Sequence, residues 1–193
     1  DSQNAEVDLP KKRPKLSDFV RVNPEEAFRY SNCKVLREVH IDLLPETINL
    51  LATSQRIRAL EDVVNKFYSK DSLVAQQIID GYAPKCYVAE VLSLKHPARR
   101  LAPPCFRSFA LCAKEDLEQG EPIGLYIGRV IEENRERDFD QTYAYGMDCR
   151  NLGYNGPDLV LENKTEGNEC RFINDCYCRE NGENSVNAVA CLV

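Results

Sequence analysis

The sequence predicts an α+β fold, in which a helical segment precedes a domain of small β-sheets, and three observations lead to that class. Apolar residues recur three and four positions apart between Pro45 and Tyr82, which is the spacing of amphipathic helices. From Phe106 onwards, short runs of β-branched and aromatic residues alternate with polar turns. The chain of 193 residues is long enough to bury a core without disulfide bonds. We therefore expect three parts: a flexible basic and polar tail over 1–26, a mainly helical accessory segment over 27–104, and a β domain over 105–193.

The first 26 residues are polar and punctuated by proline, as in a flexible tail. They include the basic run "KKRPK" at Lys11–Lys15, which fits either a nuclear-import signal or a solvated linker. On the first interpretation the protein is nuclear. The formal net charge of −6 argues against direct nucleic-acid binding through phosphates and favours a basic protein partner, although plain solubility explains the same charge.

Two helices are expected within the accessory segment. The apolar face of the first is formed by Ile57, Leu60, Val64 and Phe67. The second follows "SKDS", and its apolar residues are Leu73, Val74, Ile78 and Ile79. Faces of this kind are usually packed into a core, so we assign the helices no chemistry. The next run, "PKCYVAEVLSLKHPARR", fits either a strand or a last helix.

The β domain is expected to contain short strand-like segments. In chain order these read "FRSFALCA", "IGLYIGRVI", "TYAYGMD", "DLVLEN", "RFIN" and "NAVACLV". The last run is apolar and stops at Val193 without a turn or a cap, so we expect its strand to continue in a longer parent protein.

Nine cysteines are spread singly along the chain, several of them in apolar contexts. This pattern predicts buried free thiols in a reducing compartment. The tightest cluster, Cys170 with Cys176 and Cys178, lacks the paired spacing of a structural zinc site. We therefore predict no metal site within the chain and leave open one that is completed after Val193. No apolar stretch approaches the roughly 18 residues that a membrane span needs, so no membrane partner is expected.

Two blocks of the β domain stand in the order found in a known family. The first is "ALCAKEDLEQGEPIGLYIGRVI" at 110–131, and the second is "LENKTEGNECRFIND" at 161–175, with the strand-like "TYAYGMD" between them. Together they resemble the SET domain of protein lysine methyltransferases, whose second block reads Gly-Asn, two variable residues, Arg-Phe-Ile-Asn and then His-Ser-Cys. The resemblance covers roughly Phe106 to Val193 and implies a SET-type fold of small sheets with a knot-like core.

The resemblance also implies a cofactor site. In SET domains the asparagine of this block threads through a loop and contacts S-adenosylmethionine, which makes Asn174 the principal cofactor residue. The neighbours that the resemblance adds are Arg171, Phe172 and Asp175. A side-chain amide offers both a donor and an acceptor, which suits the amino and carboxylate groups of a methionine moiety. Phe172 is more simply a core residue, and Arg171 suits a structural hydrogen-bonding role equally well.

An aromatic channel for the substrate lysine is the second implication. Tyr126 matches a channel tyrosine of some family members and is our catalytic candidate, while Tyr143 and Tyr145 lie on the strand that commonly borders the peptide groove. Tyrosine rings shield a lysine stem and attract its charged form, and their hydroxyl groups orient the nitrogen. The alternative for all three is ordinary half-buried packing in a strand.

Three departures from the family pattern bear on activity. The usual Gly-x-Gly, which brings the backbone close to the cofactor, is replaced by Ser108-Phe109-Ala110, whose outer residues carry a Cβ. Asp175 stands where the family has histidine. The closing strand with its Asp-Tyr pair would lie beyond Val193, so we expect the chain by itself to be incomplete as a catalyst.

The sequence therefore predicts a protein lysine methyltransferase that uses S-adenosylmethionine and acts on a basic protein tail, by family analogy a histone. The rival is a catalytically inactive SET-like module that binds a peptide or scaffolds a partner. The substituted Gly-x-Gly favours the rival, and the nearly intact "GNECRFIN" disfavours it. An unrelated β domain with a coincidental motif is a third alternative.

Overall fold

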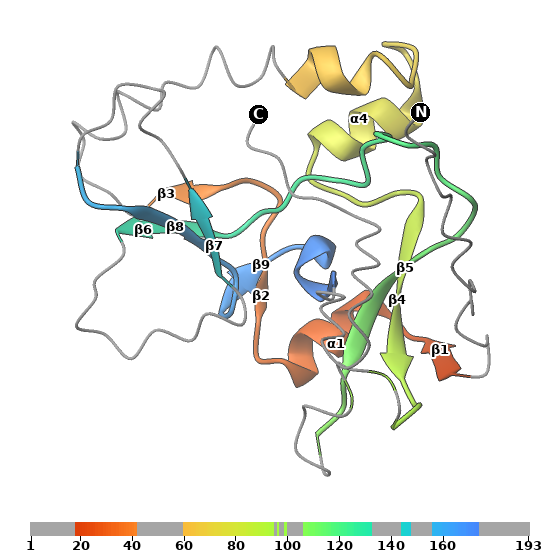
Figure 1. Cartoon of the computed structure of the whole chain (residues 1–193), viewed down its shortest axis with the longest axis vertical. Helices are drawn as coiled ribbons and strands as arrows, with labels where there is room; N and C mark the ends of the chain where they lie inside the picture. The colour runs from red at the N-terminus through yellow and green to blue at the C-terminus, as the bar shows by residue number, and fades with distance from the viewer. Residues whose placement is uncertain are drawn as a thin grey trace, which may run out of the picture.

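The fold combines short helices with small β-sheets, which confirms the α+β class (Figure 1). The structure is a computed structural model, and everything that follows concerns the residues that it describes. These residues are 18–41, 60–94, 96, 99, 106–132, 144–147 and 156–173.

One sheet has three strands in the order β1-β4-β5. Its members are β1 (Phe19–Arg21), β4 (Cys86–Val91) and β5 (Phe109–Ala113), and both pairings are antiparallel. For the segment "PKCYVAEVLSLKHPARR", the sequence left a strand and a last helix as alternatives, and β4 shows that its first part is a strand. The β-branched and aromatic residues of β4 and the burial on both of its faces are in keeping with this. The sheet also joins residues on both sides of the expected boundary between 104 and 105.

The expected tail is shorter than predicted. Residues 18–26 do not belong to a tail, because Phe19 pairs with Val91 in the sheet and helix α1 (Pro24–Tyr30) follows directly. The helix begins with a good cap: the Asn23 side chain accepts a hydrogen bond from the backbone N–H of Glu25. Residues 1–17, with the basic run, lie outside the described residues. The described part of 27–104 also contains strands beside its helices.

A second sheet has four strands in the order β3-β6-β8-β7. The strands are β3 (His40–Ile41), β6 (Arg129–Glu132), β8 (Leu159–Glu162) and β7 (Ala144–Met147). β8 is buried along its whole length, as its central position requires. Only the end of the predicted strand "IGLYIGRVI" is a strand. Before it, a Cβ on Gly128 would lie 2.4 Å from the carbonyl oxygen of Glu162, so this irregular segment approaches β8 more closely than a side chain allows.

A short parallel pair, β2 (Lys34–Val35) with β9 (Glu166–Gly167), leads into the 3₁₀-helix η4 (Glu169–Phe172). The sequence predicts that "RFIN" is strand-like, but this is wrong for its three described residues: Arg171 and Phe172 belong to η4, and Ile173 is its C-cap. The reason is local: the Asn168 side chain accepts a hydrogen bond from the backbone N–H of Cys170 and so caps a helical turn.

The second predicted helix is confirmed as α4 (Leu73–Ile79), with its N-cap at Ser72. Of the first, residues 60–64 are helical, and Ile57 lies outside the described residues. Val64 packs with Ala75 and Ile78 in a buried cluster, so both helices serve as packing elements, as expected. Within the described ranges, no helix combines the length and the apolar character that crossing a membrane requires.

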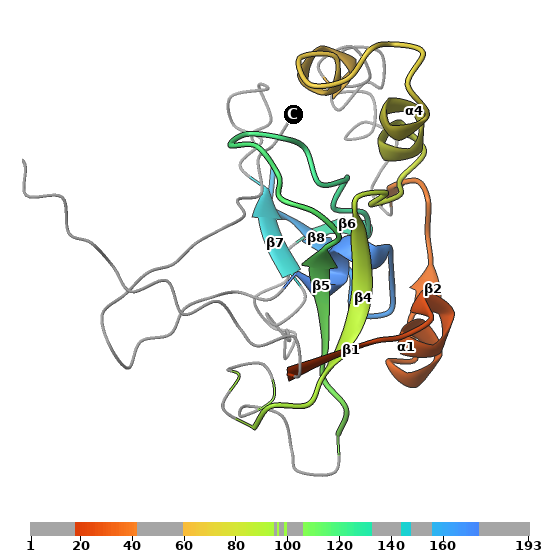
Figure 2. The ribbon, with the colours of Figure 1, turned by 90° about the vertical axis from the view of Figure 1, so that its right-hand side faces the viewer.

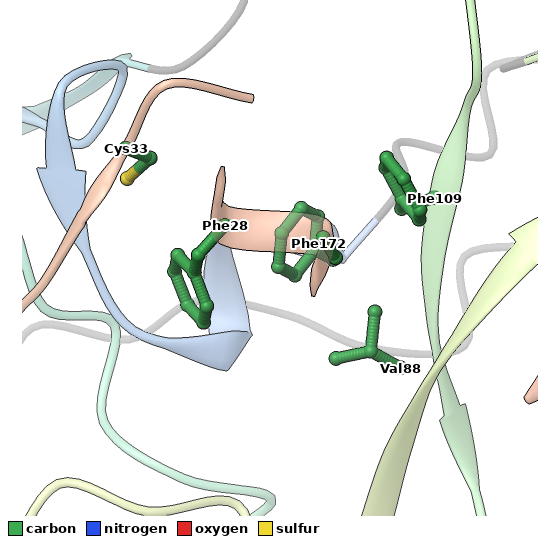
Figure 3. Close-up of a cluster of buried hydrophobic side chains, with 6 residues drawn as sticks. Phe28, Cys33, Val88, Phe109 and Phe172 are labelled. Carbon is green, nitrogen blue, oxygen red and sulfur yellow. The ribbon is translucent and has the colours of Figure 1, made fainter. Parts of the chain in front are cut away.

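The main core lies between α1, η4 and one face of β4 and β5 (Figures 2 and 3). Phe172 stands between two other rings, 5.2 Å from Phe28 and 5.8 Å from Phe109 between centroids. Edge-on contacts at these distances are favourable for aromatic pairs. The three rings therefore join the N-terminal helix, η4 and the three-stranded sheet into one core.

A buried carboxylate fastens the helical region to the loop after β5. Glu121 accepts hydrogen bonds from the Tyr68 hydroxyl and, at 2.7 Å, from Lys85 Nζ, while its own side chain is only 5% exposed. The hydrogen bond from Lys85, followed by that from Tyr68, lowers the pKa of Glu121 from 4.5 to about 2. Burial and the bond to the carboxylate raise the pKa of Tyr68 to about 12.

Because the pKa of Glu121 is lower in the folded chain than in the unfolded chain, its contribution to stability is present above pH 4.5 and is lost as the pH falls towards 2. We expect Glu121→Gln to lower the melting temperature by a few degrees at pH 7 and to flatten the pH dependence of stability between these values. Glu115→Gln is the matched control, because Glu115 also contacts Lys85 but is 57% exposed. Thermal unfolding followed by circular dichroism at several pH values measures both; equal effects of the two variants would contradict the assignment.

Candidate functional site

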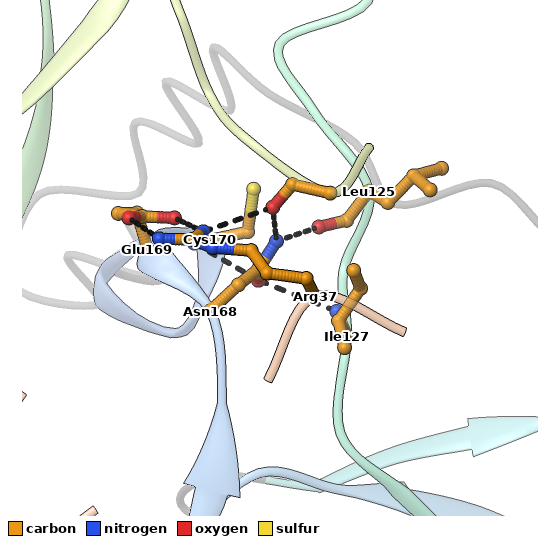
Figure 4. A network of polar contacts seen from close by, with 7 residues as sticks. Arg37, Leu125, Ile127, Asn168, Glu169 and Cys170 are labelled. Carbon is orange, nitrogen blue, oxygen red and sulfur yellow. Dashed lines mark hydrogen bonds and ion pairs between the residues drawn. The ribbon is translucent and has the colours of Figure 1, made fainter. Parts of the chain in front are cut away.

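The candidate site is built around the side-chain amide of Asn168, which is fully buried (Figure 4). Its nitrogen donates to the carbonyl oxygens of Gly81, at 2.9 Å, and Leu125, at 2.7 Å. Its oxygen accepts from the backbone N–H groups of Ile127, at 3.4 Å, and Cys170, at 3.3 Å. A primary amide has two donor hydrogens and two acceptor positions, so all four are used. This one side chain connects the turn after α4, the segment before β6 and η4.

Arg37 strengthens the same junction from the segment between β2 and β3. Its guanidinium group makes two bonds to the Glu169 carboxylate, of 2.5 and 2.7 Å, and a third of 3.1 Å to the carbonyl oxygen of Gly81. It also lies 3.9 Å from the centre of the Tyr82 ring. The hydrogen bonds to Glu169 raise the pKa of Arg37 above its ordinary value. Planar bidentate pairing fixes orientation as well as distance.

Gly81 is the point at which the Asn168 and Arg37 interactions meet. It has a φ of +81°, a conformation that glycine adopts without strain. A Cβ on this residue would lie 2.4 Å from the carbonyl oxygen of Arg37 and 2.7 Å from Ile127 Cδ1. Both the backbone conformation and the space therefore require glycine here.

The catalytic candidate Tyr126 lies between the two residues that Asn168 holds. Its ring is 6.4 Å from that of Tyr145 on β7, at an angle of 55°. The structure thus brings together two of the three tyrosines that the sequence selected, from segments about twenty residues apart. Tyr126 also packs against the buried cluster of Ala83, Cys86 and Cys170. The third tyrosine, Tyr143, lies outside the described residues.

The stretch Ser108-Phe109-Ala110, which stands in place of the family's cofactor-binding Gly-x-Gly, is buried. Ser108 precedes β5 and its carbonyl oxygen accepts a hydrogen bond from Val91 N–H, while Ala110 pairs with Ala89 inside the sheet. Phe109 belongs to the main core. The backbone of this stretch is consequently part of the sheet.

In the second block, Arg171 and Phe172 are buried within the fold. The Arg171 guanidinium group donates to the carbonyl oxygens of Asn163, at 3.0 Å, and Lys164, at 3.1 Å. Arg171 therefore makes structural hydrogen bonds, which is one of the two roles that the sequence suggested for it. Phe172 meets Phe109 in the core, so the second block touches the stretch that replaces the Gly-x-Gly. The remaining predicted cofactor residues, Asn174 and Asp175, lie outside the described residues.

The thiols of the described cysteines fit the expectation of buried free cysteines. Cys33, Cys86 and Cys170 are free and buried, and Cys112 is free and partly buried. Burial raises the pKa of Cys86 to about 11 and that of Cys170 to about 12, so neither is a ready nucleophile at neutral pH. In the part of the chain that the structure describes, no three His, Cys, Asp or Glu side chains gather as metal ligands would.

A partly open cavity of about 250 Å³ lies beside Tyr82 and Glu169. It is lined mainly by α4, the turn after α4, β4 and β5. None of the predicted site residues that the structure describes lines this cavity.

Sequence reasoning missed the residues that hold the site together. Asn168 stands inside the motif "GNECRFIN", but the family resemblance gives a role only to Asn174. The signal for Asn168 is an amide residue that directly follows a glycine and stands three positions before the Arg-Phe-Ile run. Gly81 directly follows the predicted helix, where glycine is a common C-terminal signal. Arg37 stands in a segment that carries no motif.

No protein-family model matches the chain, and no curated protein matches it either.

We expect Arg37→Lys to destabilise the fold by about 1–2 kcal/mol, because an ammonium group cannot reproduce the bidentate pair with Glu169 or the stacking on Tyr82. Lys34→Ala is the control: its ion pair with Glu166 spans 3.9 Å and the lysine is 71% exposed, so the change should stay within about 0.5 kcal/mol. Urea denaturation measures both values. A loss for Arg37→Lys as small as that of the control would show that the pair contributes little.

Proposed function

We propose that the chain forms part of a SET-type protein lysine methyltransferase, with the knot-like core of that fold. It transfers a methyl group from S-adenosylmethionine to a lysine side chain of a basic protein tail, by family analogy a histone, in the nucleus. The proposal rests on the sequence motifs and on one observation of the structure, the meeting of the Tyr126 and Tyr145 rings beside the buried Asn168.

The tyrosine pair supports the proposal because it supplies what a lysine substrate needs. Two tilted rings 6.4 Å apart offer aromatic surface to the apolar stem of a lysine and attract its ammonium group. Tyr145 is 37% exposed, so the pair is accessible from solvent. The two residues come from separate motif regions, and their proximity is not required by the local sequence.

Bound S-adenosylmethionine supplies an electrophilic methyl group. The chain's own part in the reaction is to hold the lysine nitrogen in line with that group and to keep it neutral. The lysine ammonium group would first release a proton to solvent water, which frees the nitrogen lone pair to take the methyl group. The hydroxyl group of Tyr126 is the polar atom that we propose to orient this nitrogen.

The described members of the predicted cofactor set are engaged within the fold itself. Phe109 and Phe172 fill the core, and Arg171 donates to two backbone carbonyl oxygens. The polar recognition of the cofactor is assigned by the motif to Asn174 and Asp175.

The rival function, a SET-like module that binds a peptide without transferring methyl groups, is favoured by one feature. Ser108 and Ala110 are 8% and 5% exposed, and their backbone runs within the sheet. Side chains at these positions oppose the close backbone approach that a Gly-x-Gly permits. Loss of cofactor binding would leave the tyrosine pair as a peptide-binding surface.

Calorimetric titration of S-adenosylmethionine into the natural protein at full length separates the two functions. We expect saturable binding, followed by methyl transfer to a lysine-containing basic peptide. Tyr126→Phe should retain the fold and lower the rate of transfer about tenfold, the effect of one lost hydrogen bond to the nitrogen.

Tyr87→Phe is the matched control, because Tyr87 lies on β4 on the face opposite Cys86 and so away from the cluster that Tyr126 contacts. Its rate should equal that of the wild type. Absence of cofactor binding by the folded protein would favour the rival, and a wild-type rate for Tyr126→Phe would remove Tyr126 from the site.

A further inference from the structure

The segment that carries Tyr126 has no regular secondary structure of its own. Residues 121–128 belong to no helix or strand, so ladder hydrogen bonds do not fix the backbone around Tyr126. Yet Ile127, the next residue, is fully buried. Some other interaction must therefore hold the backbone at this point.

Asn168 supplies that interaction on both sides of Tyr126. Its amide nitrogen binds the carbonyl oxygen of Leu125, and its amide oxygen binds the N–H of Ile127 (Figure 4). A peptide group in a neighbouring strand would offer the same donor and acceptor pair. The side chain thus replaces the missing strand partner of the residue between them.

The amide is itself held in place. Its second hydrogen is bound to the carbonyl oxygen of Gly81, whose position Arg37 also fixes, and its oxygen accepts from Cys170 N–H in η4. A flip of the amide that exchanged its oxygen and its nitrogen would break all four bonds. The orientation of the Tyr126 backbone is consequently set by atoms more than forty residues away on either side.

We infer that Asn168 is a positioning residue, which directs the Tyr126 ring towards Tyr145. The positioning follows from the geometry alone; its effect on methyl transfer rests on the proposed function. Asn168 does not touch the substrate in this account and acts only through Tyr126.

The test places 3-fluorotyrosine at position 126 of the chain and records its ¹⁹F NMR signal. We expect Asn168→Ala to shift and broaden this signal, because the ring then samples several orientations. Asn163→Ala is the matched control: Asn163 is also fully buried, but its amide has no hydrogen-bond partner among the described residues. The control should leave the signal at the wild-type position.

A second variant keeps the test informative if Asn168→Ala does not fold. Asn168→Asp preserves the size and the acceptor oxygen but places a carboxylate oxygen opposite the carbonyls of Gly81 and Leu125, so the same shift is expected. An unchanged ¹⁹F signal in a folded variant at position 168, or an equal shift in Asn163→Ala, would overturn the inference.

The catalytic consequence is tested separately in the full-length protein. Asn168→Ala should lower kcat about as much as Tyr126→Phe does and should add little in the double variant, because both changes act on one group. Full additivity would overturn the catalytic role. If the wild type transfers no methyl group, the proposed function fails while the NMR result still decides the positioning.

Discussion

The fold near the candidate site depends on one buried amide. Asn168 lies where the turn after α4, the segment before β6 and η4 converge, and it makes one hydrogen bond with each of four backbone groups. Leaving such groups buried without partners would cost several kcal/mol in total, since each unsatisfied group costs about 1–3 kcal/mol. The three segments can pack closely only because a single side chain satisfies all of these groups.

The neighbouring residues make the junction rigid. Gly81 allows a backbone conformation and an approach that a Cβ would prevent, and Arg37 connects this turn to Glu169. Aromatic packing of Phe172 then joins η4 to the sheet of β1, β4 and β5. A site built on such a framework can hold the Tyr126 and Tyr145 rings in a fixed relation, which is what an aromatic channel for lysine requires.

The sequence predicted those features that depend on local patterns. The α+β class, helix α4 and the positions of β5, β7 and β8 follow from apolar spacing and from turn residues. Local patterns do not predict features that depend on long-range contacts: the three residues of β1 become a strand only beside β4. The 3₁₀ turn at Arg171 is not predicted for a similar reason, because its cap depends on the position of the Asn168 side chain. Of the candidate site, the motifs selected Tyr126 and Tyr145 separately, and the contact between their rings emerges only from the structure. The supports of the site were not predicted, since hydrogen bonds between distant backbone groups leave no periodic trace.

Amide hydrogen exchange, followed by NMR on this chain, tests the role of Asn168 most directly. The N–H groups of Ile127 and Cys170 share its side-chain oxygen as acceptor. The account predicts that both exchange slowly, with similar opening free energies, and that Asn168→Ala accelerates both together. Rapid exchange of the Ile127 amide in the wild-type chain, while the amides of β4 remain protected, would contradict it.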